Sequence, residues 1–141
     1  MFIDASAIVA ILARESGHAA FIDRIVETSS RLSVSPLVRL ESVLALARMK
    51  GVEPGNAVRT QRMTEECDKL YDKFIDRIKA DEMAISGEIG RAALSAYARY
   101  GKGGGHPASL NLIDCFSYAC AKSLGVGLLY KGVDFAQTDV G

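Results

Sequence analysis

Four acidic residues occupy positions from which they could form one metal site together. Asp4 directly follows a short apolar run at the start of the chain, and Asp134 follows another near its end. Glu41 and Asp114 lie in the first two turns of two expected helices. Carboxylates gathered in one cleft repel each other unless cations neutralise them, and Mg²⁺ or Mn²⁺ prefer such oxygen ligands. A metal held this way can activate water and stabilise the charge that develops on a phosphodiester.

Each of these residues also has a purely structural interpretation. Asp4 could cap the helix that follows it, and Asp114 in a first turn gains from the helix dipole. Asp134 taken alone could be a surface turn residue. Glu41 falls within the apolar arc of its helix, where a glutamate is unusual without a partner, although Arg48 could supply one. The four residues together favour a shared site more strongly than any one of them.

The remaining polar candidates are interpreted as structural or as supporting residues. His106, in a glycine-rich loop, is expected to order that loop or to contact substrate rather than to act as a base or metal ligand. His18 is expected to be a solvated helix residue. The lysines and arginines of 59–79 are expected to form a solvated helix face, with phosphate contact as the alternative.

The composition indicates an ordinary globular domain with no overall attraction to nucleic acid. The 141 residues suit one domain, with 49% hydrophobic and 24% charged residues. Lys plus Arg equals Asp plus Glu at 17 each, so the net charge is zero. A polyanionic partner would therefore have to meet a local basic patch or bound metal ions.

Cysteine usage and the missing targeting signals point to the cytoplasm and to no membrane partner. The chain has three cysteines in no CxxC pair, which favours reduced thiols over disulfides or a zinc site. No apolar stretch approaches the ~20 residues of a membrane span. Asp4 interrupts the basic-then-apolar order of a signal peptide. The three cysteines are Cys67, Cys115 and Cys120.

Strands and helices are expected to alternate, which predicts an α/β fold with a short, mostly parallel sheet. Such a sheet binds ligands beyond the carboxyl ends of its strands, where the four acidic residues are expected. The expected strands are 2–4, 31–34, 81–86 and 126–132, with a last edge strand within 133–141. The expected helices are 5–14, 18–29, 36–50, 56–79 (which a break could divide), 86–100 and 111–124. A turn is expected at 53–55 and a loop at 101–111.

Three segments of the chain resemble the PIN-domain ribonucleases, and within them the VapC-type toxins of bacterial toxin–antitoxin pairs. These segments are "FIDASAIVAIL" at 2–12, "SPLVRLESVLAL" at 35–46 and "HPASLNLIDCFSYACAKSLGVGLLYKGVDFAQTDV" at 106–140. The last is long and specific, whereas the first alone would be weak. The resemblance implies a single PIN domain over 1–141, with a three-layer fold that has helices on both faces of the sheet.

The resemblance also implies a Mg²⁺-dependent endoribonuclease, with Mn²⁺ as a second candidate metal. Asp4 and Asp114 are similar to the metal ligands of the family, and Glu41 to its third acidic member. Asn111 and Ser6 are similar to supporting polar residues.

The fourth acidic position of the family departs from its usual place in this chain. Many PIN domains carry that acid directly after the last strand, where this chain has Gly132. The acid here is Asp134, two residues later, so the resemblance leaves open whether it reaches the site.

The partners that the resemblance implies are an RNA substrate, a cognate antitoxin and a second copy of the chain. The antitoxin tail is expected to cross the active-site cleft and inhibit the enzyme. DNA would be met only indirectly, through the antitoxin. The loop "GHPASLN" at 105–111 is expected to border the substrate groove.

Two other functions compete with this one. A phosphatase of the haloacid dehalogenase type would use Asp4 as nucleophile, but it needs a second Asp where this chain has Ser6. A PIN-like binding module could act mainly within an antitoxin–DNA complex. The presence of Asp4, Glu41 and Asp114 favours catalysis over such a module.

Overall fold

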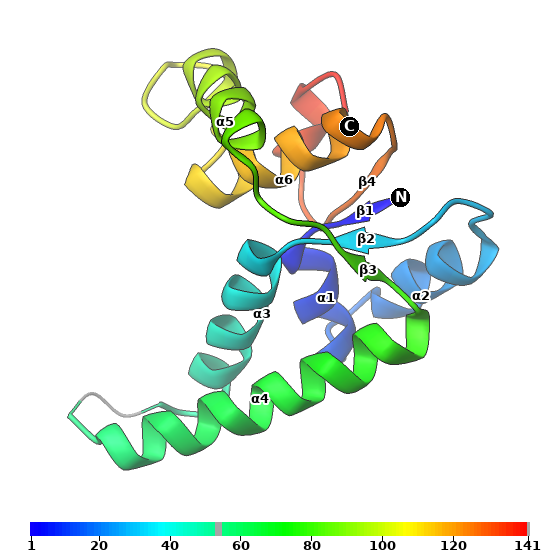
Figure 1. Ribbon diagram of the computed structural model, residues 1–141. Coiled ribbons are helices and arrows are strands. Elements are labelled where there is room, and N and C mark those ends of the chain that lie inside the picture. The colour runs from blue at the N-terminus through cyan, green and yellow to red at the C-terminus, as the bar shows by residue number, and fades with distance from the viewer. Residues whose placement is uncertain (53–54, 141) are drawn as a thin grey trace.

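Four short parallel strands form one sheet at the centre of the molecule (Figure 1). The computed structural model describes residues 1–52 and 55–140. Within these residues the strand order is β3-β2-β1-β4, and every neighbouring pair is parallel. The strands are β1 (Phe2–Ile3), β2 (Ser33–Val34), β3 (Asp81–Glu82) and β4 (Leu128–Leu129). Each has two residues, so the strands are shorter than predicted.

Helices cover both faces of this sheet, which confirms the predicted three-layer α/β fold (Figure 1). The helices of one face are α1 (Ala5–Leu12), α2 (His18–Glu27), α3 (Pro36–Met49) and α4 (Ala57–Ile78). The other face carries α5 (Gly87–Tyr100) and α6 (Leu112–Leu124). The alternative of a broken helix over 56–79 is wrong, because α4 is one continuous helix of 22 residues.

The strand order reverses beside β1. The chain passes from β1 to β2 and β3 on one side, and β4 then lies on the other side of β1. Parallel sheets bind ligands at such a switch point, beyond the carboxyl ends of the two strands concerned. Asp4 directly follows β1, and Lys131 lies just after β4. The topology therefore places Asp4 and Lys131 side by side at the switch point, at the carboxyl ends of β1 and β4.

Side-chain caps fix the starts of helices that the sequence predicts. Ser35 Oγ accepts the N–H of Val38 at 3.4 Å, and Pro36 occupies the first turn of α3. Ser86 Oγ accepts the N–H of Ile89 at 3.3 Å at the start of α5. Each cap satisfies an amide that has no partner within its helix, so it sets where the helix begins.

The chain end differs from the sequence prediction. Residues 133–141 were expected to hold an edge strand, but Phe135–Gln137 form a 3₁₀ helix, η1. Phe135 is buried, and its ring lies 5.1 Å from that of Tyr130. Burying this ring turns the chain back toward the core instead of along a sheet edge, so the edge-strand prediction is wrong. Two residues of the expected turn at 53–55, Glu53 and Pro54, lie outside the described residues.

The hydrophobic core lies between the sheet and its helices. Phe2, Ile3 and Leu129 of the central strands are completely buried. The cysteines are also buried, and all of them are free thiols, as predicted: Cys67, Cys115 and Cys120. They fill the core as small apolar side chains.

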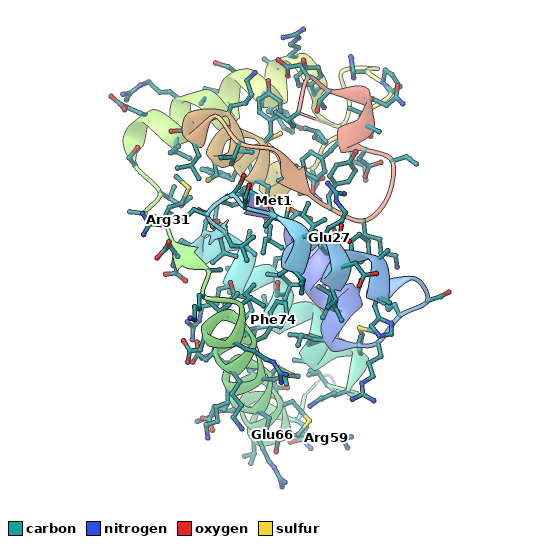
Figure 2. All side chains as sticks on the ribbon, turned by 90° about the vertical axis from the view of Figure 1, so that its right-hand side faces the viewer. Met1, Glu27, Arg31, Arg59, Glu66 and Phe74 are labelled. Carbon is teal, nitrogen blue, oxygen red and sulfur yellow. The ribbon has the colours of Figure 1, made fainter. Side chains whose placement is uncertain are left out.

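The long helix α4 extends away from the sheet. In Figure 2, Met1 and Arg31 lie together near the sheet, whereas Glu66 and Arg59 lie at the far end of the molecule. The basic side chains of 59–79 are exposed, which confirms the predicted solvated face. Among the described residues, no helix is both long enough and apolar enough to cross a membrane.

Candidate active site

A cleft of about 340 Å³ opens at the carboxyl ends of β1 and β4. Its lining includes all four acidic residues that the sequence predicts to share a metal site. The side chains that line it are Asp4, Ala5, Ser6, Val9, Glu15, Glu41, Ala45, Asn111, Asp114, Lys131, Asp134 and Phe135. Residues far apart in the sequence are thus brought together where the sheet topology predicts.

Asp4 uses its two carboxylate oxygens differently. Its Oδ2 accepts the backbone N–H of Ser6 at 2.9 Å and the Ser6 hydroxyl at 2.6 Å, so Asp4 is the N-cap of α1. Its Oδ1 is buried and has no hydrogen-bond partner, while the residue as a whole is 3% exposed. A buried carboxylate oxygen without a partner is costly, because it has lost its water and gained nothing in return. This oxygen is therefore available to a ligand in the cleft.

Asp114 is held by the capping box that starts α6. Its Oδ2 accepts the backbone N–H of Asn111 at 2.7 Å, while Asn111 Oδ1 accepts the N–H groups of Ile113 and Asp114. The pKa of Asp114 is raised to about 6: burial and the negative charges of Asp4 and Asp134 raise it, and the hydrogen bonds of Asn111 lower it. These hydrogen bonds with Asn111 fix the orientation of the Asp114 carboxylate.

Glu41 projects from α3 into the same cleft and is half-buried. Burial is the main cause that raises its pKa to about 7, followed by the charges of Asp4 and Asp114. Arg48 lowers the pKa of Glu41 slightly, but its guanidinium donates to the Leu44 carbonyl at 3.1 Å. Glu41 therefore lies near the acids Asp4 and Asp114. Arg48, which the sequence offered as its partner, bonds instead to the Leu44 carbonyl.

Asp134 reaches the cleft although it lies two residues beyond the position usual in the family. It is exposed at the start of η1, and its charge contributes to the raised pKa of Asp114. Gly132 adopts a φ of 108°, a conformation that L side chains rarely take. The chain therefore turns at Gly132, and the buried Phe135 ring anchors the segment that presents Asp134.

Two charged residues of the cleft were missed by the sequence analysis. Lys131 and Glu15 form an ion pair between their side chains. The backbone N–H of Lys131 donates to Ser6 Oγ at 2.9 Å, so Ser6 joins Lys131 to Asp4. Lys131 follows β4 at the same edge as Asp134, and this position could have identified it. Glu15 could not have been identified in this way, because its position depends on the left-handed turn at Arg14 (φ 54°), which no sequence pattern predicts.

The two histidines have structural contacts. His106 Nδ1 lies 3.2 Å from the donating N–H of Ala108, and its ring packs edge-on against Tyr100 at 4.9 Å. These contacts confirm the expectation that His106 orders its loop. His18 is half-buried rather than fully solvated, because its Nδ1 lies 2.9 Å from the Glu15 carbonyl oxygen.

The donor set of the cleft fits a hard divalent cation. Asp4 Oδ1 is buried without a partner, and burial, together with the charge of Asp4, raises the pKa values of Glu41 and Asp114. Within 1–52 and 55–140, no three Asp, Glu, His or Cys side chains are arranged as a complete metal-binding group. Mg²⁺ suits such a site, because it is commonly bound by one or two carboxylates and keeps several waters.

Comparison with known proteins identifies the family. The model of the PIN domain matches residues 1–141. A VapC ribonuclease of Rhizobium meliloti is 46% identical over 140 residues, which cover 99% of each chain. The ribonuclease VapC42 of Mycobacterium tuberculosis is 37% identical over 142 residues, covering 99% of this chain and 96% of the relative.

A solved structure has the same fold at low sequence identity. The crystal structure of VapC20 from Mycobacterium tuberculosis, a sarcin-ricin loop cleaving toxin, aligns with a TM-score of 0.72 at 15% identity. The alignment covers 99% of this chain and 95% of that toxin. A chain in a toxin–antitoxin complex from Klebsiella pneumoniae aligns with a TM-score of 0.59 at 14% identity. The chain therefore belongs to the PIN-domain family and, within it, to the VapC ribonucleases.

Proposed function

We propose that this protein is a Mg²⁺-dependent endoribonuclease and the toxin of a toxin–antitoxin pair. The observation that carries the proposal is the convergence of Asp4, Glu41, Asp114 and Asp134 on one cleft. The buried Asp4 Oδ1 lacks a partner in that cleft, as expected of a metal ligand. The names of its relatives, VapC ribonucleases at 46% and 37% identity, support the same activity.

In this proposal, the acidic residues of the cleft have different roles. A divalent metal, with Mn²⁺ as a substitute for Mg²⁺, would supply an activated water and neutralise charge on the scissile phosphate. Asp4 and Asp114 would hold the metal, each fixed in direction by its hydrogen bonds to Ser6 or Asn111. Glu41 would accept a proton from water; in the metal-free protein, burial and the charges of Asp4 and Asp114 raise its pKa to about 7.

Asp134 extends the acidic wall of the cleft and acts through the charge that it adds beside Asp114. Ser6 cannot serve as the second acid of an Asp-nucleophile phosphatase, because its hydroxyl donates to Asp4 and accepts from Lys131. The contacts of Ser6 thus favour the metal mechanism over the phosphatase mechanism.

The partners in this proposal are RNA, a cognate antitoxin that inhibits the nuclease, and a second copy of the chain. The fold shared with a chain of a toxin–antitoxin complex supports the antitoxin. Light scattering separates a dimer from the 15.1 kDa protomer. The proposed compartment is the cytoplasm. DNA would be bound only indirectly, through the antitoxin.

The proposal is tested by RNA cleavage with purified, antitoxin-free protein. We expect cleavage in Mg²⁺ or Mn²⁺ and none in excess chelator. Asp114→Asn should reduce the single-turnover rate by at least about a hundredfold, because it removes one charged metal ligand. Asp23→Asn on the exposed face of α2 is the matched control, and it should cleave at the wild-type rate.

Cleavage that persists in chelator, or that survives Asp114→Asn, would show that the metal mechanism is wrong. A protein that binds its antitoxin but cleaves no RNA would instead be a binding module.

A further inference from the structure

The acidic cleft contains a cation that the proposed mechanism does not use. Of the described residues that line it, five are acidic and Lys131 is the single basic one. The chain has equal numbers of acidic and basic residues, so its overall charge does not attract RNA. An RNA strand with a charge on every phosphate therefore needs local cations, and a metal at Asp4 accounts for only one phosphate.

The backbone of Lys131 is tied to the floor of the cleft. Its N–H donates to Ser6 Oγ at 2.9 Å, and that hydroxyl donates to Asp4 Oδ2 at 2.6 Å. Two hydrogen bonds thus connect Lys131 to the carboxylate that would hold metal. The base of the Lys131 side chain is accordingly fixed beside the proposed metal site.

The side chain of Lys131 lines the cleft together with the acidic residues. Its ammonium group pairs with Glu15, which follows α1, whereas Asp4 precedes α1. The eight residues of α1 span about 12 Å at 1.5 Å per residue. The ammonium is therefore held at Glu15, which lies at the opposite end of α1 from Asp4. The Lys131 side chain is 47% exposed, so RNA can reach it.

We propose that Lys131 is a substrate-positioning residue that binds a neighbouring backbone phosphate of the RNA. Glu15 holds the ammonium group in the free protein and competes with that phosphate for it. This inference rests on the proposed function, because it assigns the phosphodiester substrate to the same cleft. A partly exposed ion pair such as this one contributes little to stability, so exchanging the Glu15 carboxylate for a phosphate costs the protein little.

Two substitutions should change RNA affinity in opposite directions. Lys131→Met removes the cation and keeps the apolar stem, so it should weaken RNA binding by about five- to twentyfold. It should also reduce the slope of log affinity against log salt by about 0.7, the value for one phosphate of a single strand. Lys131→Arg should retain binding. Glu15→Gln frees the ammonium and should tighten binding by about two- to threefold.

The measurement is the fluorescence anisotropy of a short, labelled single-stranded RNA in Ca²⁺, with the RNA checked for integrity afterwards. Lys122→Met is the control for charge removal, because Lys122 forms a comparable exposed ion pair with Asp139 outside the cleft. Glu66→Gln is the control for Glu15→Gln, because Glu66 pairs with Arg62 on α4, far from the sheet (Figure 2). Thermal melting confirms that each variant is folded.

A second readout separates positioning from a merely structural effect. In single-turnover cleavage with Mg²⁺, Lys131→Met should raise the half-saturating protein concentration and leave the maximal rate within about twofold, as for uniform binding. If Lys131→Met binds RNA like wild type, or if wild type binds no RNA, the inference is overturned. Loss of the proposed function is a different result, namely a wild-type protein that cleaves no RNA with Mg²⁺ or Mn²⁺.

Discussion

At the scale of single residues, Asp4 caps a helix and also has a free oxygen for the proposed metal. Its Oδ2 caps α1, and its Oδ1 is buried without a partner beside the other acids. The cap fixes the direction of the carboxylate, so the free oxygen is held in place before any metal binds. The local structure and the proposed chemistry therefore depend on the same side chain.

Two substitutions at Asp4 separate the cap from the charge. Asp4→Asn keeps a good N-cap and removes the charge, whereas Asp4→Ala removes both. We expect both variants to lose RNA cleavage. Asp4→Ala should be less stable than Asp4→Asn by about 1 kcal/mol, measured by urea denaturation without metal. Equal stabilities would show that the cap contributes nothing, and an active Asp4→Asn would remove Asp4 from the metal site.

At the scale of secondary-structure elements, Ser6 joins the start of α1 to the chain after β4. Its hydroxyl donates to Asp4 Oδ2 and accepts from the Lys131 N–H. Ser6→Ala would leave that N–H without its partner and would remove a constraint on Asp4. We expect the free energy of unfolding to fall by about 1 kcal/mol, as measured by urea denaturation.

A matched serine controls for the substitution itself. Ser95 Oγ donates to the Arg91 carbonyl within the exposed face of α5, so Ser95→Ala should leave stability unchanged or slightly higher. If Ser6→Ala is as stable as Ser95→Ala, the link between α1 and β4 is not energetically significant.

The elements also show what could be predicted from the sequence. Asp4, Glu41 and Asp114 could be placed at one edge, because parallel strands and capped helices have recognisable patterns. Whether Asp134 reaches the site could not be predicted, since this depends on the turn at Gly132 and on burial of Phe135. The same burial made the edge-strand prediction fail.

The ion pair between Lys131 and Glu15 could not be predicted from the sequence, for a similar reason. Glu15 and Lys131 are 116 residues apart, and no pattern of helix or strand relates them. Only the left-handed turn at Arg14 and the switch point beside β1 bring them together.

At the scale of the whole molecule, the acidic cleft should make metal-free stability depend on pH. The pKa of Glu41 is raised from 4.5 to about 7, and that of Asp114 from 3.8 to about 6. The folded protein thus binds these protons at a pH where the unfolded chain does not. Stability without metal should therefore increase as the pH falls from about 8 toward 5.

Glu41→Gln tests this linkage. It removes the buried charge, so at pH 8 without metal it should raise the free energy of unfolding, on the order of 2 kcal/mol after allowing for solvent screening. The variant should also depend less on pH between 5 and 8, as measured by denaturation at several pH values. Glu66→Gln, an exposed substitution on α4, should change neither quantity. A wild-type protein that loses stability on acidification over this range would contradict the raised pKa values of Glu41 and Asp114.

The central claim is that the carboxylates around β1 and β4 hold a divalent metal. The most direct measurement is a titration of the antitoxin-free protein with Mn²⁺, followed by the electron paramagnetic resonance signal of the free ion. The account predicts that wild type and Asp23→Asn bind Mn²⁺ alike, whereas Asp4→Asn and Asp114→Asn bind it at least about tenfold more weakly. Mn²⁺ binding of equal strength in wild type and in both cleft variants would contradict it.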